Sequence, residues 1–251
     1  MPAAVVVLGA SNVARGTRQL LARVQHRFGP CHLFVAAGHG RSYGCRSRVL
    51  FRELPGIVHC QLWPALVEPR HAVMHAIITD VGNDIVFGCD NRLILQWVQE
   101  CLERLQQLNA QVTLARLPTA SLRRMTRWQF EVARQLFFPT RRLTFGQAVQ
   151  QALELDHGLA ELAAARNVPT REPPGGWYGW DPIHVRRNYY DAAWAEFLAP
   201  SDSAADKPPS NISRPWSLHK LRPYESVRMG RRKIVAQPSL VLPNGTRVSW
   251  Y

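Results

Sequence analysis

The 251-residue sequence lacks the long apolar runs that a membrane protein needs. No stretch reaches the roughly 20 consecutive apolar residues of a spanning helix. The first residues also lead into an apolar segment without the charged region and cleavage site that are typical of a signal peptide. We therefore expect a cytoplasmic protein with no membrane partner.

Lysine is nearly missing, and cysteine is not arranged to bind a metal. The three lysines all follow residue 200, so arginine is the only permanently charged cation before it: Lys207, Lys220 and Lys233. The five cysteines contain no CxxC pair, and we expect them to be reduced packing residues: Cys31, Cys45, Cys60, Cys89 and Cys101. We predict neither a metal site nor an organic cofactor.

Acidic residues are scarce in the last fifth of the chain. Residues 201–251 carry nine Lys or Arg against three acids, so this segment contributes +6 to the net charge of +13. Such a basic field can attract anionic partners, but the sequence has no zinc-finger spacing, RNP-type motif or helix-turn-helix, so a nucleic-acid partner is not expected. A segment rich in Pro, Ser, Asp and Ala over 200–215 predicts a linker. We divide the chain into a domain over 1–200 and a basic extension over 201–251.

Apolar runs and helical periodicity alternate along the first 200 residues. Strands are predicted over 5–8, 33–37, 57–62, 73–79 and 111–117, and helices over 13–28, 91–108 after an N-cap at Asp90, 146–166 and 185–198. In the helix over 91–108, an inward stripe is expected at Leu93, Val98, Leu102 and Leu105. This alternation predicts an α/β fold, a three-layer α/β/α sandwich with a mainly parallel, flavodoxin-like sheet. Residues 121–142 give a blurred pattern that fits either a lid or a packed helical excursion.

The basic extension ends in a hairpin pattern. Apolar residues over 239–242 and 246–250 flank Pro243-Asn244-Gly245, and Asn-Gly suits a tight turn between antiparallel strands. An isolated hairpin is marginally stable in water. We therefore expect this one to pack on the domain or on a second subunit, which would make a homo-oligomer.

Three residues could form a nucleophilic centre. Ser11 directly follows the first apolar run, while Asp181 and His184 lie three residues apart late in the chain. A serine hydroxyl needs an imidazole to take its proton, and the imidazole needs a carboxylate to fix its tautomer. Alone, Ser11 would more simply be a helix N-cap, but the three residues together favour a hydrolase.

Four short segments resemble the blocks of the SGNH hydrolase superfamily, the GDSL-type esterases and lipases. They are Gly9-Ala10-Ser11-Asn12, Gly40 within 37–42, Val81-Gly82-Asn83-Asp84, and Asp181-Pro182-Ile183-His184. The resemblance implies that Ser11 is the nucleophile, His184 the base and Asp181 its orienting acid. It implies an oxyanion hole made by the backbone amides of Ser11 and Gly40 and the side chain of Asn83. Gly38 and Gly44 remain alternatives to Gly40.

The resemblance further implies cleavage of a small-molecule carboxylic ester, such as a carbohydrate O-acetyl or a short acyl ester, through an acyl-enzyme. The chain departs from the family at Ala10, where an aspartate is usual, and at Val81, where a glycine is usual. Asp84 is expected to cap the segment that follows it. The alternative function is a catalytically silent SGNH-fold module that binds a ligand or protein through its basic tail.

A nucleotide-binding oxidoreductase is a weaker alternative. Gly9-Ala10-Ser11 followed by Gly16 superficially resembles a dinucleotide loop. However, the second predicted strand ends at Ala37 with no acidic residue for a ribose, and a Tyr-x-x-x-Lys pair is impossible in a region without lysine.

Overall fold

A seven-stranded sheet forms the middle of the molecule. The computed structural model describes residues 2–49, 51–67, 71, 73–137, 144–199 and 218–251. The strands lie in the order β10-β11-β2-β1-β5-β6-β7, and every pair is parallel except β10 with β11. Their bounds are β1 Ala3–Leu8, β2 Cys31–Ala36, β5 Met74–Ile78, β6 Gln111–Ala115, β7 Thr170–Arg171, β10 Leu240–Val241 and β11 Arg247–Trp250.

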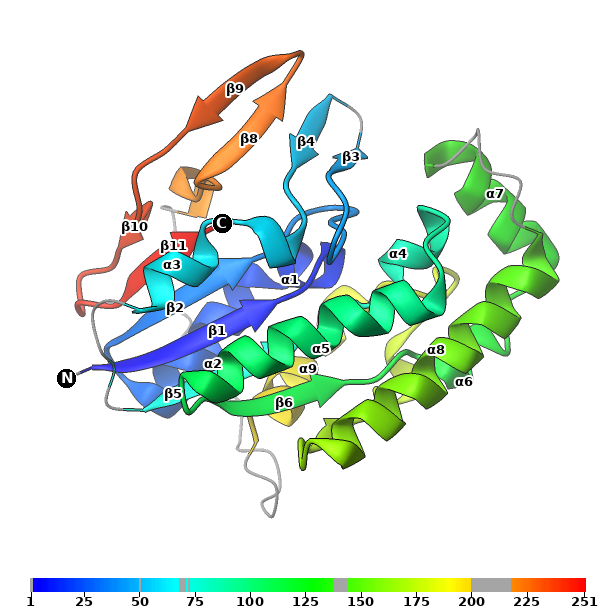
Figure 1. The fold of residues 1–251 in the computed structure, drawn as a ribbon, viewed down its shortest axis with the longest axis horizontal. Coiled ribbons are helices and arrows are strands. Elements are labelled where there is room, and N and C mark those ends of the chain that lie inside the picture. Colours follow the sequence, from blue (N-terminus) through cyan, green and yellow to red (C-terminus); the bar gives the residue numbers. More distant parts are fainter. Residues whose placement is uncertain (1, 50, 68–70, 72, 138–143, 200–217) are drawn as a thin grey trace.

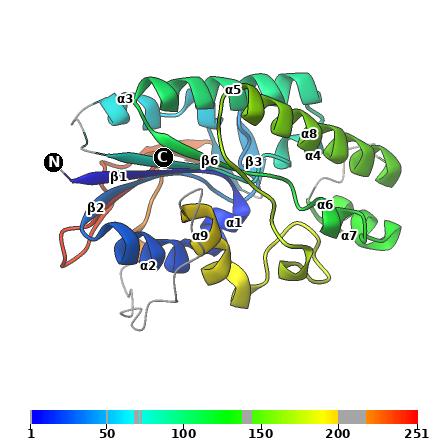
Figure 2. The ribbon, with the colours of Figure 1, turned by 90° about the horizontal axis from the view of Figure 1, so that it is seen from below.

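Helices cover both faces of this sheet (Figure 2). On one face lie α2 Thr17–Phe28 and α9 Tyr190–Leu198. On the other lie α3 Leu62–Val67, α5 Asn91–Gln107 and α8 Phe145–Ala165. The predicted three-layer α/β/α fold with a mainly parallel sheet is therefore confirmed. None of the helices in the described part of the chain is long and apolar enough to span a membrane.

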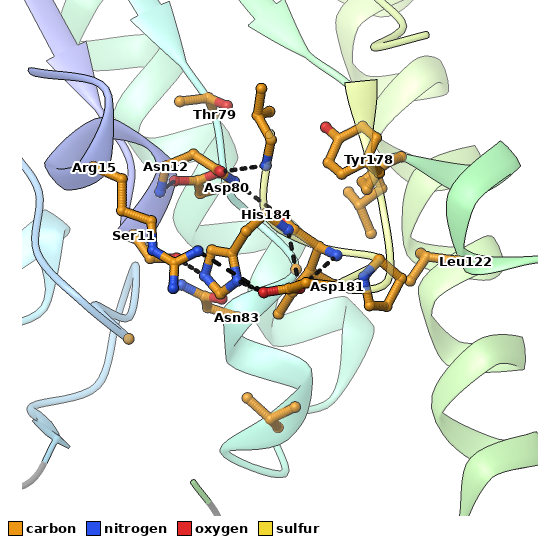
Figure 3. Close-up of a pocket in the computed structure, with 18 of the residues that line it drawn as sticks. Ser11, Asn12, Arg15, Thr79, Asp80, Asn83, Leu122, Tyr178, Asp181 and His184 are labelled. Atoms are coloured by element: carbon orange, nitrogen blue, oxygen red, sulfur yellow. Dashed lines mark hydrogen bonds and ion pairs between the residues drawn. The ribbon is translucent and has the colours of Figure 1, made fainter. Parts of the chain in front are cut away.

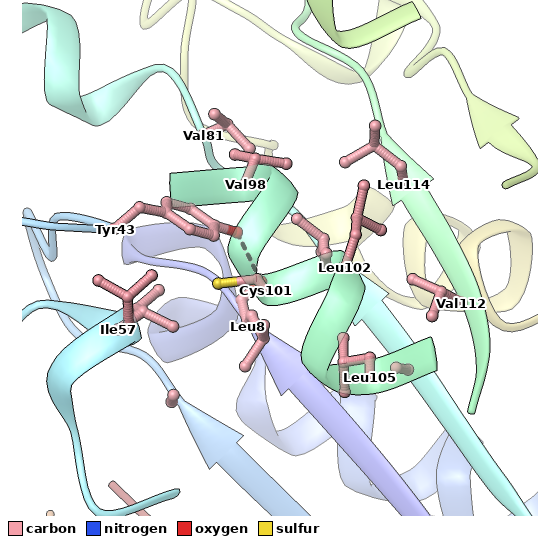
Figure 4. Close-up of a cluster of buried hydrophobic side chains, with 14 of the residues drawn as sticks. Leu8, Tyr43, Ile57, Val81, Val98, Cys101, Leu102, Leu105, Val112 and Leu114 are labelled. Atoms are coloured by element: carbon pink, nitrogen blue, oxygen red, sulfur yellow. Dashed lines mark hydrogen bonds between the residues drawn. The ribbon is translucent and has the colours of Figure 1, made fainter. Parts of the chain in front are cut away.

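The two core layers explain why the first strand is a continuous apolar run. Val5 and Val7 of β1 pack into the layer with α2 and α9, while Val6 and Leu8 pack into the layer with α5, and all four are fully buried. Figure 4 shows the second layer around Leu8, with the side chains of α5 packed over it. A strand buried on both faces needs apolar residues at every position.

Helix α5 confirms the predicted helix over 91–108. The Asp90 carboxylate accepts a hydrogen bond from the Arg92 amide at 2.7 Å, as an N-cap should. The predicted inward stripe is right for Val98, Leu102 and Leu105, but Leu93 is 39% exposed and Ile94 is buried instead. The stripe begins one residue later than the sequence pattern indicated.

The predicted strand over 57–62 is wrong. Its residues form a 3-10 turn, Ile57–His59, which leads into α3. Ile57, Leu62 and Leu66 are nevertheless buried in the same core layer. A short apolar run fits a buried strand and a buried helical turn equally well, so the pattern alone could not distinguish them.

The helix predicted over 185–198 begins later than expected. After His184 the chain makes a β-bridge between Val185 and Tyr178, then a 3-10 turn, Arg187–Tyr189, before α9 starts. A further 3-10 turn, Gly175–Trp177, precedes this loop. The loop that carries Asp181 and His184 is thus fixed on both sides before the helix begins.

The blurred segment over 121–142 is a helical excursion in its described part. It contains the end of α6 Thr119–Leu122 and all of α7 Arg127–Phe137, and residues 138–143 lie outside the described residues. Two further short helices, α1 Ser11–Arg15 and α4 Asn83–Val86, follow β1 and β5 at their carboxyl ends. These ends of parallel strands are where ligand sites form in such folds.

A second, antiparallel sheet stands beside the first (Figure 1). It is built from β3 Ser47–Val49, β4 Arg52–Leu54, β8 Glu225–Arg228 and β9 Arg231–Ile234, in that order. Two strands from the first quarter of the chain therefore pair with two strands from its last tenth or so. A 3-10 turn at Leu218–Lys220 precedes β8. The extension over 201–251 thus contributes to this sheet.

The predicted C-terminal hairpin is confirmed, and it packs on its own domain. Strands β10 and β11 are antiparallel, with Gly245 between them at φ +86°. Strand β11 then runs parallel to β2, from Arg247 opposite His32 to Trp250 opposite Val35. The predicted linker falls largely on residues outside the described part, and the boundary at residue 200 stays a prediction. Residues beyond 218 nevertheless supply strands to both sheets.

The docking of β11 predicts a large stabilising role for Trp250. Trp250 is 8% exposed, and its indole N–H donates to the Ala37 carbonyl at 2.8 Å. Trp250→Ala should lower the free energy of unfolding in urea by about 3–5 kcal/mol, because it leaves a cavity and an unpaired carbonyl. Trp128→Ala is the matched control, since Trp128 is 65% exposed. Equal losses in the two variants would contradict the structural role of β11.

Candidate active site

Ser11, His184 and Asp181 form one chain of hydrogen bonds (Figure 3). Ser11 is the first residue of α1, directly beyond β1, and is 8% exposed. Its Oγ lies 2.8 Å from His184 Nε2, and His184 Nδ1 lies 2.6 Å from Asp181 Oδ2. The structure therefore brings together the three residues that the sequence singled out, although Ser11 and His184 are 173 positions apart.

The surroundings of Asp181 favour its charged form. Burial by itself would raise the pKa of the carboxyl group. The hydrogen bond and charge of His184, together with the amides of Ile183 and His184, outweigh this effect and hold the pKa below its usual value. An ionised carboxylate on Nδ1 leaves Nε2 of the ring facing the serine as the proton acceptor.

Asn83 presents an unused donor beside these residues. It is the first residue of α4 and lines the same cavity as Ser11 and His184. Its Nδ2 is buried and has no hydrogen-bond partner among the described residues. A buried amide without a partner costs free energy, so its persistence at a cavity wall is typical of a group that meets a ligand.

Of the three candidate glycines, Gly40 is the one that lines the cavity. It has φ +62°, and a Cβ there would lie 2.4 Å from Val49 Cγ2, so another residue would be strained. A Cβ on Gly44 would instead lie 1.9 Å from the Trp97 ring, and one on Gly38 would lie 2.4 Å from Leu54. Crowding therefore does not separate the three glycines, and Gly40 is favoured as the second amide donor because it lies at the cavity wall.

Asp80 is a residue of the site that the sequence analysis missed. It follows β5 at φ +58°, and its Oδ2 accepts hydrogen bonds from the Ala10 and Asn12 amides, both at 2.9 Å. These amides flank Ser11, so the carboxylate fixes the turn that presents the hydroxyl group. An acidic residue directly after a central strand was the available signal.

Asn12 joins the serine turn to the histidine loop. Its Nδ2 donates to Asp80 Oδ1 at 2.8 Å and to the Ile183 carbonyl at 3.0 Å. Its Oδ1 accepts from the Val185 amide at 2.9 Å and from the Tyr190 hydroxyl at 3.2 Å. The residues on both sides of His184 are thus tied to the residue after Ser11. The sequence analysis quoted Asn12 within a motif but gave it no role.

Asp84 does not cap α4, contrary to the expectation from sequence. The N-cap residue is Gly82, which makes no side-chain cap. Asp84 is fully buried and accepts hydrogen bonds from the Ser42 hydroxyl and, at 3.0 Å, from the Tyr43 amide. It therefore links the loop after Gly40 to helix α4, which carries Asn83, and so holds two of the proposed oxyanion donors in one unit.

The cavity beside Ser11 has a volume of about 650 Å³ and two unlike sides. Apolar side chains of α4, α6, α7, α8 and the segment between α6 and α7 line one side: Ile85, Leu122, Met125, Phe130 and Val149. Residues of the second sheet line the other. In the described part of the chain, no three His, Cys, Asp or Glu residues gather in a way that could hold a metal ion.

Comparison with known proteins gives a fold match. No family model and no curated protein matches the sequence. Among solved structures, a member of the lipolytic G-D-S-L family from Veillonella parvula has a TM-score of 0.51 at 12% identity, covering 77% of this chain and 96% of that one. A GDSL-like lipase from Bacteroides thetaiotaomicron has a TM-score of 0.50 at 15% identity, with coverage of 77% and 84%.

A third structure, a carbohydrate acetylesterase family member from Sinorhizobium meliloti, has a TM-score of 0.50 at 11% identity, with coverage of 78% and 95%. The chain therefore has the fold of the GDSL-type lipases and esterases, as the sequence resemblance implied. At these identities, the likeness extends to the fold and no further.

The burial of Asp84 predicts an unusual dependence of stability on pH. Burial raises its pKa to about 6, from an ordinary value of 3.8, against the lowering effect of its hydrogen bonds. The folded protein then keeps a proton that the unfolded chain releases, so stability falls as pH rises between these values. A shift of this size contributes about 3 kcal/mol.

Asp84→Asn cannot ionise and should lose less stability than the wild type between about pH 4 and pH 7. Urea unfolding at a series of pH values measures both proteins. Parallel stability curves would show that Asp84 titrates normally in the folded state.

Proposed function

We propose that the protein is a serine hydrolase that cleaves carboxylic esters through an acyl-enzyme. Ser11 is the nucleophile, His184 the general base and Asp181 the group that orients the imidazole. The observation that carries this proposal is the continuous hydrogen-bond chain from Ser11 Oγ through His184 to Asp181, at the wall of a cavity that also holds the unpaired Asn83 amide.

Acylation begins when Ser11 Oγ attacks the ester carbonyl carbon and its proton passes to His184 Nε2. Asp181 stabilises the imidazolium that forms. The carbonyl oxygen becomes negative, and the amides of Ser11 and Gly40 and the side chain of Asn83 donate hydrogen bonds to it. His184 then gives its proton to the leaving alcohol as the carbon–oxygen bond breaks, which leaves the acyl group on Ser11.

Deacylation repeats these steps with water. His184 takes a proton from the water molecule as its oxygen attacks the acyl carbon, and then returns that proton to Ser11 Oγ as the carboxylic acid leaves. The residues that stabilise the oxyanion act a second time. Every proton in the cycle passes through His184 Nε2, which is why its position relative to Ser11 matters most.

The cavity and the fold support a small acyl ester as substrate. A volume of about 650 Å³ lies within the usual range of small-molecule sites. The structures that share the fold are described as a lipase and as a carbohydrate acetylesterase family member, so their substrates would be esters. We therefore propose a short or medium acyl ester, with a carbohydrate O-acetyl group as one form of it.

Replacement of Ser11 tests the nucleophile. Ser11→Ala should remove hydrolysis of p-nitrophenyl esters across a series of chain lengths by several orders of magnitude, and should also prevent covalent labelling by a fluorophosphonate. Ser239→Ala, in the C-terminal hairpin, is the matched control and should retain both. If the fluorophosphonate labels Ser11→Ala as well as the wild type, another residue is the nucleophile. If the wild type and Ser11→Ala both fail to hydrolyse the esters and to react with the fluorophosphonate, the catalytically silent binding module is the better description.

Replacement of Asn83 tests the oxyanion hole. Asn83→Ala should lower kcat by about 10²–10³-fold with a smaller change in KM, because its donor acts on charge that develops in the transition state. Asn188→Ala provides the control, since Asn188 is exposed and lies outside the cavity lining. A rise in KM with an unchanged kcat would instead make Asn83 a residue that binds the ground state.

A further inference from the structure

We propose that the ester cleaved at Ser11 has an anionic alcohol portion, bearing a carboxylate or a phosphate, which Arg52 and Arg228 bind. This inference rests on the proposed hydrolase function and names its substrate class. The two arginines come from β4 and β8 of the second sheet, and both line the cavity that holds Ser11.

The register of the second sheet places the arginines in one row. Val49 of β3 lies opposite Arg52 of β4, Arg52 lies opposite Arg228 of β8, and Arg228 lies opposite Arg231 of β9. Residues directly opposite one another in antiparallel strands project from the same face. Since Val49, Arg52 and Arg228 all line the cavity, this is the face that the sheet turns towards the active site.

Acidic residues lie on the opposite face of the same sheet. There Glu53 pairs with Arg48 at 3.8 Å, and Glu225 pairs with Arg232 at 3.2 Å and with Arg46 at 3.5 Å. In contrast, Arg52, Arg228 and Arg231 make no ion pair within the described part of the chain. The sheet therefore neutralises the charge of one face and leaves the cavity face positive.

Such a row is unfavourable without an anion. Like charges directly opposite each other in a sheet are destabilising. Burial lowers the pKa of Arg52, and the charge of Arg228 lowers it further. A carboxylate or phosphate placed between the two guanidinium groups would remove this repulsion and accept hydrogen bonds from both.

The lining of the cavity decides which end of the ester meets the arginines. An acyl chain suits the apolar lining residues, such as Leu122 and Phe130. The basic face is then left for the alcohol portion, whose oxygen takes a proton from His184 as it leaves.

The apolar wall formed by α6, α7 and α8 thus receives the acyl chain. In Figure 3, Leu122 of that wall lies well away from Ser11 and Arg15. A substrate with one apolar end and one anionic end therefore matches both sides of the cavity.

Three esters with the same acyl group test the proposal. They are meta-butyryloxybenzamide, which is neutral, meta-butyryloxybenzoate and meta-butyryloxyphenyl phosphate. The wild type should show a higher kcat/KM for the two anionic esters, and this preference should shrink as salt is added. Whichever of the two is preferred distinguishes a carboxylate from a phosphate substrate.

The variants Arg52→Gln and Arg228→Gln should each lower the preference for the anionic esters over the amide by about tenfold, mainly through KM. Arg52→Lys should restore part of it because the charge is kept. Arg232→Gln is the matched control, since Arg232 lies on the opposite face of the same sheet, and it should keep the wild-type preference. Equal kcat/KM values for all three esters, or equal losses in the Arg232 variant, would overturn the proposal while leaving the hydrolase intact.

Binding by the Ser11→Ala protein separates this inference from the proposed function. Titration calorimetry with phenyl phosphate and benzoate, and with neutral benzamide, should show anion binding that Arg52→Gln removes. If no ester is hydrolysed but this binding is found, the hydrolase proposal fails and the anion site stands. Binding of a single-stranded oligonucleotide but of neither small anion would overturn the anion site and assign the face to nucleic acid.

Discussion

The geometry of the site depends on the hydrogen bonds of the Asn12 side chain. Ser11, the proposed nucleophile, lies just beyond the first strand, and His184 lies in a loop 173 residues later, yet Ser11 Oγ and His184 Nε2 are 2.8 Å apart. Asn12 uses both ends of its amide to bind Asp80 on one side and the backbone on either side of His184 on the other. Because the contacts are made with backbone groups, the position of the loop is fixed independently of the His184 side chain. An imidazole held in this way needs little reorganisation before it accepts a proton.

Two carboxylates beside the site hold its loops in place through hydrogen bonds. Asp80 accepts from the amides that flank Ser11, and Asp84 accepts from the loop beyond Gly40. At the turn where Ala10 stands, the carboxylate is therefore supplied by Asp80, from the loop after β5. Asp84 is fully buried, so it orients its donors at the cost of a raised pKa. Both strengthen the view of the site as a preorganised unit.

The basic extension contributes strands to both sheets. Its strands β8 and β9 complete the sheet begun by β3 and β4, and its last strand extends the central sheet beside β2. Sequence composition indicated only an excess of positive charge in this region. In the folded chain, the charge divides by strand face, with glutamates neutralising one face and the arginine row facing the cavity. The extension therefore supplies part of the cavity wall, and through Arg228 it contributes to the anion site that we propose.

The sequence by itself determined the layered α/β fold, the helix capped by Asp90 and the terminal hairpin. It also singled out Ser11, Asp181 and His184 as a candidate nucleophilic centre. Each of these features leaves a local pattern of apolar period, turn chemistry or residue type. Tertiary structure decided the rest. The pattern over 57–62 could not predict the 3-10 turn and the start of α3, since a short apolar segment can be buried as a strand or as a helical turn. Gly40 differs from Gly38 and Gly44 in that it lines the cavity. The roles of Asp80 and Asn12 and the arginine row arise from contacts between distant segments. Strand register and loop packing set those contacts, and neither leaves a periodic signal in the chain.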